Sequence, residues 1–270
     1  MPRDVILARG DGIGRGMPAK RDHLFYPALT VLISAVGFAG FSFTYFGPVI
    51  AGSYPPSGAA LHLHGWFFFL WYLLFPFQAV LIGMRRRSLH ITLGRLSVVL
   101  VVLMILTGLL VLTVRVDEAI RHGAPEIWLL YGPLILSNLV LFVGFYAAAV
   151  RMALTQRLQS HKRLMIVASA IGLGAGFFRL ILFTSGFHPL SLPVGVLACS
   201  LFIVVGMIYD LVTRRAVHPV YWIGLAAMLA VEIPLLPQIN PEGVAWINQW
   251  LAAIGEHLGF LYVPDPTVEF

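Results

Sequence analysis

Residues 59–87 read AALHLHGWFFFLWYLLFPFQAVLIGMRRR, in which 26 residues without a formal charge lead directly into three arginines. A helix needs about 20 mostly apolar residues to cross a bilayer, and this stretch is longer than that. Lys and Arg in short connections mark the cytoplasmic side of a membrane protein. The stretch therefore predicts a membrane-spanning helix whose basic end lies in the cytoplasm.

Similar apolar runs fill most of the chain, and basic residues cluster in alternate connections between them. The clusters lie in residues 3–21, 85–87, 151–163 and 214–215. This alternation places the N-terminus in the cytoplasm, and an odd number of crossings then places the C-terminus outside. We predict an all-α polytopic membrane protein with seven transmembrane helices, near residues 24–46, 59–83, 89–114, 127–150, 163–185, 190–212 and 218–238.

The composition agrees with a protein that is solvated by lipid. Hydrophobic residues make up 59% of the chain and charged residues only 11%, with a mean hydropathy of +0.87. The net charge of +6 lies in the predicted cytoplasmic connections, where orientation and anionic lipid account for it. We therefore expect no nucleic-acid partner. The single cysteine, Cys199, excludes an intrachain disulfide framework and any cysteine-rich metal site.

The chain divides into three segments without an internal domain boundary. Residues 1–23 form a basic, Gly-rich stretch that we interpret as a flexible cytoplasmic tail, and residues 24–238 form the transmembrane domain. The first apolar run, about 23 residues long, is too long for a cleavable signal peptide. Residues 239–270 form an extracytoplasmic tail. Aromatic and aliphatic residues at helical spacing within 241–262 predict an amphipathic helix on the outer membrane surface.

Several polar side chains fall inside the predicted spans. His64, Trp71 and Gln78 are seven residues apart and so share one helix face. Arg179 is costly at about 2.5–3.5 kcal/mol for a mid-membrane arginine, and Glu232, at similar depth, is its natural counter-ion. We predict an outer-leaflet layer of His62, His64, Arg179 and Glu232, with Gln78 as the inward member of the same intramembrane polar set.

Two residues of this layer, His64 and Arg179, also have simpler interpretations. His64 would equally well be an ordinary buried histidine that a neighbouring polar group satisfies, and Arg179 could extend to the outer interface and pair with lipid headgroups.

A second pair of histidines, His90 and His161, stands where two predicted helices rise from the cytoplasm. Paired histidines on separate helices can ligate heme iron, so His62, His64, His90 and His161 are the candidate cofactor ligands, with heme b as the candidate cofactor. Gly94, one turn after His90, would let a neighbouring helix or a planar cofactor come close. Histidines at cytoplasmic helix ends are also common as simple interface anchors.

At these residues the chain resembles a family of uncharacterised seven-helix bacterial inner-membrane proteins. The resemblance covers residues 24–185 and includes the patterns His-x-His-Gly…Trp…Gln and His-Lys-Arg-Leu-Met followed by an intramembrane Arg. One departure is Ile91, where the family pattern usually has Arg. The later histidine motifs also resemble those of predicted membrane proteins related to oxidase-assembly factors. The matching segments are Phe25-Tyr26, Gly40–Tyr45, His62–Gln78, His90–Arg95 and His161–Arg179.

The resemblance implies a fold and a bacterial inner-membrane location, but no established activity. We expect an accessory or assembly subunit of a membrane complex, in contact with the bilayer and with other membrane subunits, and we assign no catalytic residue. A heme-binding or redox membrane protein is the leading alternative. A small transporter that uses Arg179 and Glu232 is the second alternative, and it lacks the inverted repeat typical of such proteins.

Overall fold

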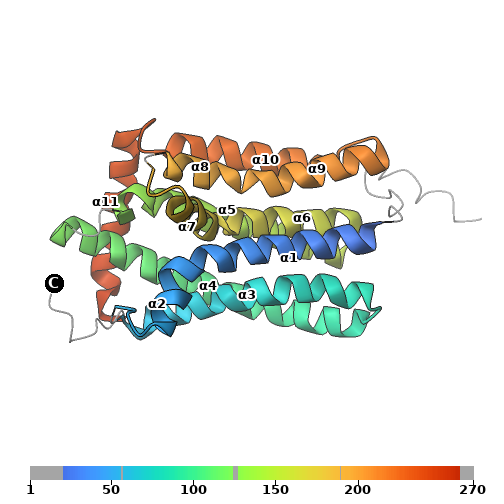
Figure 1. The fold of residues 1–270 in the computed structure, drawn as a ribbon, viewed down its shortest axis with the longest axis horizontal. Helices are drawn as coiled ribbons and strands as arrows, with labels where there is room; N and C mark the ends of the chain where they lie inside the picture. The colour runs from blue at the N-terminus through green and yellow to red at the C-terminus, as the bar shows by residue number, and fades with distance from the viewer. Residues whose placement is uncertain (1–20, 56, 124–126, 189, 262–270) are drawn as a thin grey trace, which may run out of the picture.

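The computed structural model describes residues 21–55, 57–123, 127–188 and 190–261, and in these residues every regular element is helical (Figure 1). The all-α prediction is confirmed. The predicted tail at residues 1–23 lies almost entirely outside the described residues, as does the end of the C-terminal segment.

The first helix, α1 (Asp22–Phe41), continues through a π-helical turn, η2 (Ser42–Phe46), into α2 (Gly47–Ile50). The elements that follow are α3 (Ala59–Gly83), α4 (Arg87–His122), α5 (Ile127–Leu154), α6 (Leu158–Gly172), α7 (Gly174–Thr184), α8 (Ser191–Ala198), α9 (Ser200–Arg214), α10 (Pro219–Glu232), η3 (Ile233–Leu235), α11 (Pro241–Leu258) and η4 (Gly259–Leu261).

Five helical segments among the described residues are long and apolar enough to cross a membrane, and six are if the bent pair α6–α7 forms one span. The bend between α6 and α7 is 49° and falls at Leu173, inside the fifth predicted span. The helix formed by α10 and η3, Pro219–Leu235, is shorter than a full span. Five or six spans are therefore supported, and the seventh remains a prediction, as do the orientation and the sides of the termini.

The long helices lie side by side as a bundle, and α11 crosses one end of it (Figure 1). The α3–α4, α5–α6 and α9–α10 connections, together with the start of α1, lie at the opposite end. We call these the α11 end and the corner end.

Apolar side chains fill the space between the helices and also cover the flanks of the bundle. The largest buried cluster draws on α1, α3, α4, α5, α6, α9 and α10, and includes Ile33, Trp71, Met104, Phe142, Ile203 and Met228. On the flanks, Leu73, Leu106, Val140, Leu201 and Ile223 are each more than half exposed. A surface of this kind matches a lipid environment, because exposed apolar patches of this extent are rare on soluble monomers.

Helix α4 has 36 residues, about 54 Å at 1.5 Å per residue, so it runs well past the end of the predicted span 89–114. Two pairs stabilise the extension at helical spacing: Arg115 bonds Glu118 at 2.8 Å, and Arg121 bonds Asp117 at 2.7 Å. The helix ends at Gly123, which has the positive φ that glycine tolerates at a helix C-terminus.

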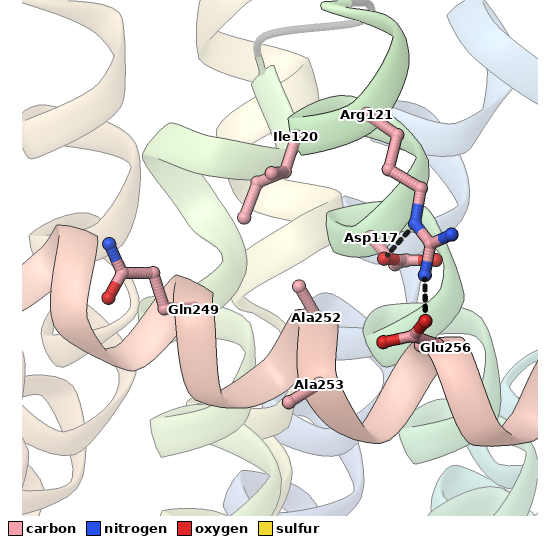
Figure 2. Close-up of a pocket in the computed structure, with 7 residues that line it drawn as sticks. All are labelled: Asp117, Ile120, Arg121, Gln249, Ala252, Ala253 and Glu256. Carbon is pink, nitrogen blue, oxygen red and sulfur yellow. Dashed lines mark hydrogen bonds and ion pairs between the residues drawn. The ribbon is translucent and has the colours of Figure 1, made fainter.

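The predicted C-terminal amphipathic helix is present as α11, and its inward face packs on protein. The buried residues of α11 are Val244, Asn248, Leu251, Ala252 and Gly255, and they contact α4 and α5. Arg121 of α4 bridges Asp117 and Glu256 beside a groove between the two helices (Figure 2). The opposite face leaves Trp246 and Trp250 exposed.

Candidate functional site

Two helical corners at the corner end, α3–α4 and α5–α6, are built in the same way. Each has one residue with positive φ, Arg85 at 59° and Gln156 at 57°. The carbonyl of the next residue, Arg86 or Arg157, accepts a helical hydrogen bond from the N–H four residues later. That N–H belongs to His90 in one corner and to His161 in the other. The two corners are related by a shift of 71 residues.

Four backbone hydrogen bonds of one corner have counterparts in the other under this shift. Arg86 N–H donates to the Leu81 carbonyl at 2.8 Å, and Arg157 N–H donates to the Met152 carbonyl at 2.8 Å. The shift also relates Trp71 to Phe142, whose rings meet edge to face with centroids 5.2 Å apart. The α3–α4 and α5–α6 hairpins therefore form a structural repeat, a feature that sequence reasoning missed.

His90 and His161 face each other across this repeat. Their ring centroids are 6.4 Å apart and the ring planes are inclined by 84°. His90 Nδ1 bonds the Gln78 carbonyl at 3.2 Å, and His161 Nδ1 bonds the Ala149 carbonyl at 2.9 Å. Because a carbonyl only accepts, we assign the proton of the His161 ring to Nδ1, so its Nε2 is the nitrogen with the lone pair. At His90 the Gln78 side-chain nitrogen lies 2.7 Å from Nδ1, nearer than the Gln78 carbonyl, so Nδ1 can accept from the amide or donate to the carbonyl.

The surroundings of this histidine pair are partly polar toward the corner and aromatic toward the bundle centre. The Gln78 side-chain nitrogen lies 2.7 Å from His90 Nδ1 and 3.2 Å from the His90 carbonyl, and the side-chain oxygen accepts from the Gly94 N–H at 3.0 Å. Deeper in the bundle, Ser97 and the Tyr146 hydroxyl share a 2.8 Å hydrogen bond. Gln78 therefore belongs to the corner end rather than to a layer with His64.

The described residues contain no group of three or more His, Cys, Asp or Glu side chains that could hold a metal ion. A metal at His90 and His161 would thus have two protein ligands. This number suits heme iron, whose four remaining positions are filled by the porphyrin.

At the α11 end, the structure separates Arg179 from Glu232. Arg179 Nε donates to the Thr44 hydroxyl at 3.1 Å, whereas Glu232 Oε1 accepts from Asn138 Nδ2 at 3.0 Å. Among the described residues, Arg179 and Glu232 form no ion pair, so the expected pairing of these two residues is wrong. Glu232 is 1% exposed, and its Oε2 has no hydrogen-bond partner among the described residues.

His62 and His64 diverge, as their two-residue spacing on α3 requires. His62 Nδ1 lies 3.1 Å from the Tyr45 hydroxyl. The His64 ring packs against Phe68 and lies close to Gly108 of α4, and its Nδ1 is buried with no partner among the described residues. The structure brings His64 within electrostatic range of Arg179 and keeps both apart from His90 and His161.

A buried ion network at the corner end was not anticipated from the sequence. Arg163 of α6 makes two hydrogen bonds to Asp210 of α9, at 2.7 and 2.6 Å, and the two side chains are 1% and 0% exposed. Arg214 bonds both Asp210 and Asp22, and Asp22 also accepts from Lys162 at 2.6 Å. The network ties α1, α6 and α9 together.

His218, at the N-terminus of α10, extends this network. Its backbone N–H donates to Asp210 at 3.3 Å, and its Nδ1 accepts from the Val220 N–H. The first turn of α10 is thereby attached to the same carboxylate as α6 and α9.

A signal for the network was present in the sequence. Asp210 is the only acid in the predicted span 190–212, and the basic run at Lys162-Arg163 begins the fifth predicted span at the same predicted membrane face. An acid at that depth implies a basic partner. The positive-inside rule accounts for the basic residues without any partner, so their number and position alone do not predict the pairing.

No family model, curated protein or solved structure matches the chain. The resemblance to the seven-helix inner-membrane family therefore remains a hypothesis that is based on the motifs alone.

Proposed function

We propose that the chain is a heme-binding membrane protein of the electron-transfer type, in which His90 and His161 would hold the iron. The observation that supports it is the facing pair of rings on two different helices, each with its Nδ1 within hydrogen-bonding distance of a carbonyl. At His161 such a hydrogen bond fixes the tautomer and orientation of a metal-binding histidine and raises its basicity.

The spacing of the rings fits this role. Two histidines on neighbouring helices would hold one iron only if their rings lie close together. The observed separation is 6.4 Å. Gly94 adds room beside the pair, because a Cβ built there would meet only the Gln78 amide, 4.0 Å away.

The surrounding residues suit such a group. A bound heme would supply one-electron redox chemistry. Exposed arginines at the same corners, including Arg86, Arg87 and Arg95, provide cations for carboxylates at the water-facing edge. On the opposite side the buried aromatic core limits access of water, which is a main determinant of heme potential.

An absorption spectrum of the purified protein, oxidised and then reduced with dithionite, tests the proposal. We expect the bands of a low-spin b-type heme. His90→Ala and His161→Ala should each abolish the same bands, because each removes one of two axial ligands. His257→Ala on α11 is the matched control, because His257 is exposed at the α11 end, and it should leave the spectrum unchanged.

Two results would contradict the proposal. One is a parent protein that stays colourless when it is produced with ample heme. The other is a spectrum that survives in both corner-end variants, since the iron would then be bound elsewhere.

An accessory subunit of a membrane complex is the second candidate, and the outward face of α11 favours it. Trp246 is 69% exposed and Trp250 is 54% exposed, while the other face of α11 already packs on α4 and α5. Exposed aromatics are typical of protein interfaces. Trp246→Ala together with Trp250→Ala should then shift the assembly to a smaller size on native gels of solubilised membranes, and an unchanged size contradicts this role.

A further inference from the structure

Arg179 on α7 is held by neutral groups only. Its Nε donates to Thr44 at 3.1 Å, its Nη1 donates to the Ala175 carbonyl at 2.8 Å, and its guanidinium lies 4.7 Å from the centroid of the Phe41 ring. None of these contacts carries a negative charge. Among the described residues, no carboxylate lies within ion-pair distance of Arg179.

The acid that the sequence suggested as its counter-ion, Glu232, accepts a hydrogen bond from Asn138 and forms none with Arg179. The other groups in electrostatic range of Arg179 are Tyr54, Tyr131 and His64. Phenols and imidazole can donate hydrogen bonds, but when neutral they do not compensate a cation. The guanidinium is therefore surrounded by donors and aromatic rings, without a counter-ion.

The backbone is shaped to hold this arrangement. The π-helical turn η2 (Ser42–Phe46) interrupts the α1–α2 helix where Thr44 meets Arg179. π-Helical turns are rare and are frequent at functional sites. Phe43 of the same turn stacks on Phe183 of α7 with ring centroids 5.0 Å apart, which fixes α7 against the turn.

We propose that Arg179, with Thr44, Tyr54 and Tyr131 around it, binds the phosphate of an anionic ligand at the α11 end of the bundle. A guanidinium matches phosphate in shape and charge, and it can offer two parallel donors. An anion also supplies the counter-charge that an arginine at membrane depth requires. The phosphate is that of an anionic lipid headgroup or a soluble phosphate. This site is separate from the histidine pair.

Thermal unfolding in nanodiscs tests the proposal with two probes. One arm adds inorganic phosphate to the protein in phosphatidylcholine nanodiscs, with sodium chloride at equal ionic strength as reference. The other arm replaces part of the phosphatidylcholine with phosphatidylglycerol. A ligand that binds only the folded state raises the thermal unfolding midpoint of the protein. We expect the midpoint of the parent protein to rise by about 2–4 °C in at least one arm. The phosphate arm identifies a soluble ligand and the phosphatidylglycerol arm a lipid.

Arg179→Gln should lose that gain, because the amide has no charge. Arg121→Gln is the control and should keep it, because Arg121 is already paired with Asp117 and Glu256. Equal gains in the parent and Arg179→Gln, or no gain of the parent in either arm, would overturn the proposal.

A second variant keeps the test decisive where Arg179→Gln fails to fold. Arg179→Lys retains the charge and loses the fork of donors, so its affinity for the effective probe should fall about tenfold. Unchanged affinity in Arg179→Lys would overturn the role of the guanidinium.

Discussion

Asp210 shows how a single residue can organise one end of the bundle. Its carboxylate accepts from Arg163, Arg214 and the backbone of His218, and it is fully buried. A buried ion pair often adds little net stability, but removal of one partner leaves an uncompensated charge. The coupling within the network is therefore measured by the stability that is lost when one charged partner is removed.

Asp210→Leu should lower the free energy of unfolding by about 3–5 kcal/mol, because it leaves the buried Arg163 without its counter-charge. Arg163→Met should cost less, because Arg214 still bonds Asp210. The double variant should be clearly more stable than the sum of the two losses predicts, since neither charge of the pair remains. Arg214 keeps its bonds to Asp22 in that variant. Denaturant unfolding in detergent measures the cycle, and additive losses would show that the two side chains are not coupled.

Helix phase and depth carry different information about the polar residues. Phase requires that His62 and His64 diverge on α3, because they are two residues apart. Arg179 and Glu232 have similar depths in the sequence, but depth says nothing of direction around the bundle. The 49° bend at Leu173 places Arg179 on a differently directed helix, α7, and a count of residues from a span end cannot detect that.

At the scale of elements, the contact between α1 and α7 depends on glycine. A Cβ at Gly40 would collide with the Gly176 carbonyl, and a Cβ at Gly176 would lie 3.1 Å from the Gly37 Cα. The two backbones thus touch directly, which holds α7 beside η2. Small residues serve this purpose in helix packing within membranes.

Gly40→Ala should therefore separate α1 from α7 and lower the unfolding midpoint, with a cost of about 1–3 kcal/mol for overpacking. Gly144→Ala on α5 is the matched control, because nothing lies within 4 Å of its Cβ position, and it should be neutral or stabilising by up to about 1 kcal/mol. Thermal unfolding in detergent compares the two. Equal effects of both changes would show that the α1–α7 contact tolerates a methyl group.

The helices themselves were largely predictable, because hydropathy marks long apolar helices. The residues at which the helices end were less predictable. The polar residues from Arg115 to His122 suggested a loop, yet their pairing continues α4 and provides the surface on which α11 packs. The π-helical turn and the corner repeat lack a hydropathy signal, since both depend on backbone geometry.

For the whole molecule, the loop charges predict on which side of the membrane each end of the bundle lies. The positive-inside rule places the corner end in the cytoplasm and the α11 end outside. The only cysteine, Cys199, is 1% exposed, so the parent should give little background in labelling experiments. New cysteines at exposed positions can therefore report the two ends separately.

Ser88→Cys marks the corner end and Gln249→Cys marks α11, and both positions are exposed. In intact cells, a membrane-impermeant maleimide should label Gln249→Cys and leave Ser88→Cys unlabelled, because the bilayer separates the two ends. Permeabilisation should make both reactive. Labelling of Ser88→Cys alone in intact cells would invert the orientation, and equal labelling of both would mean that the bundle does not cross the membrane.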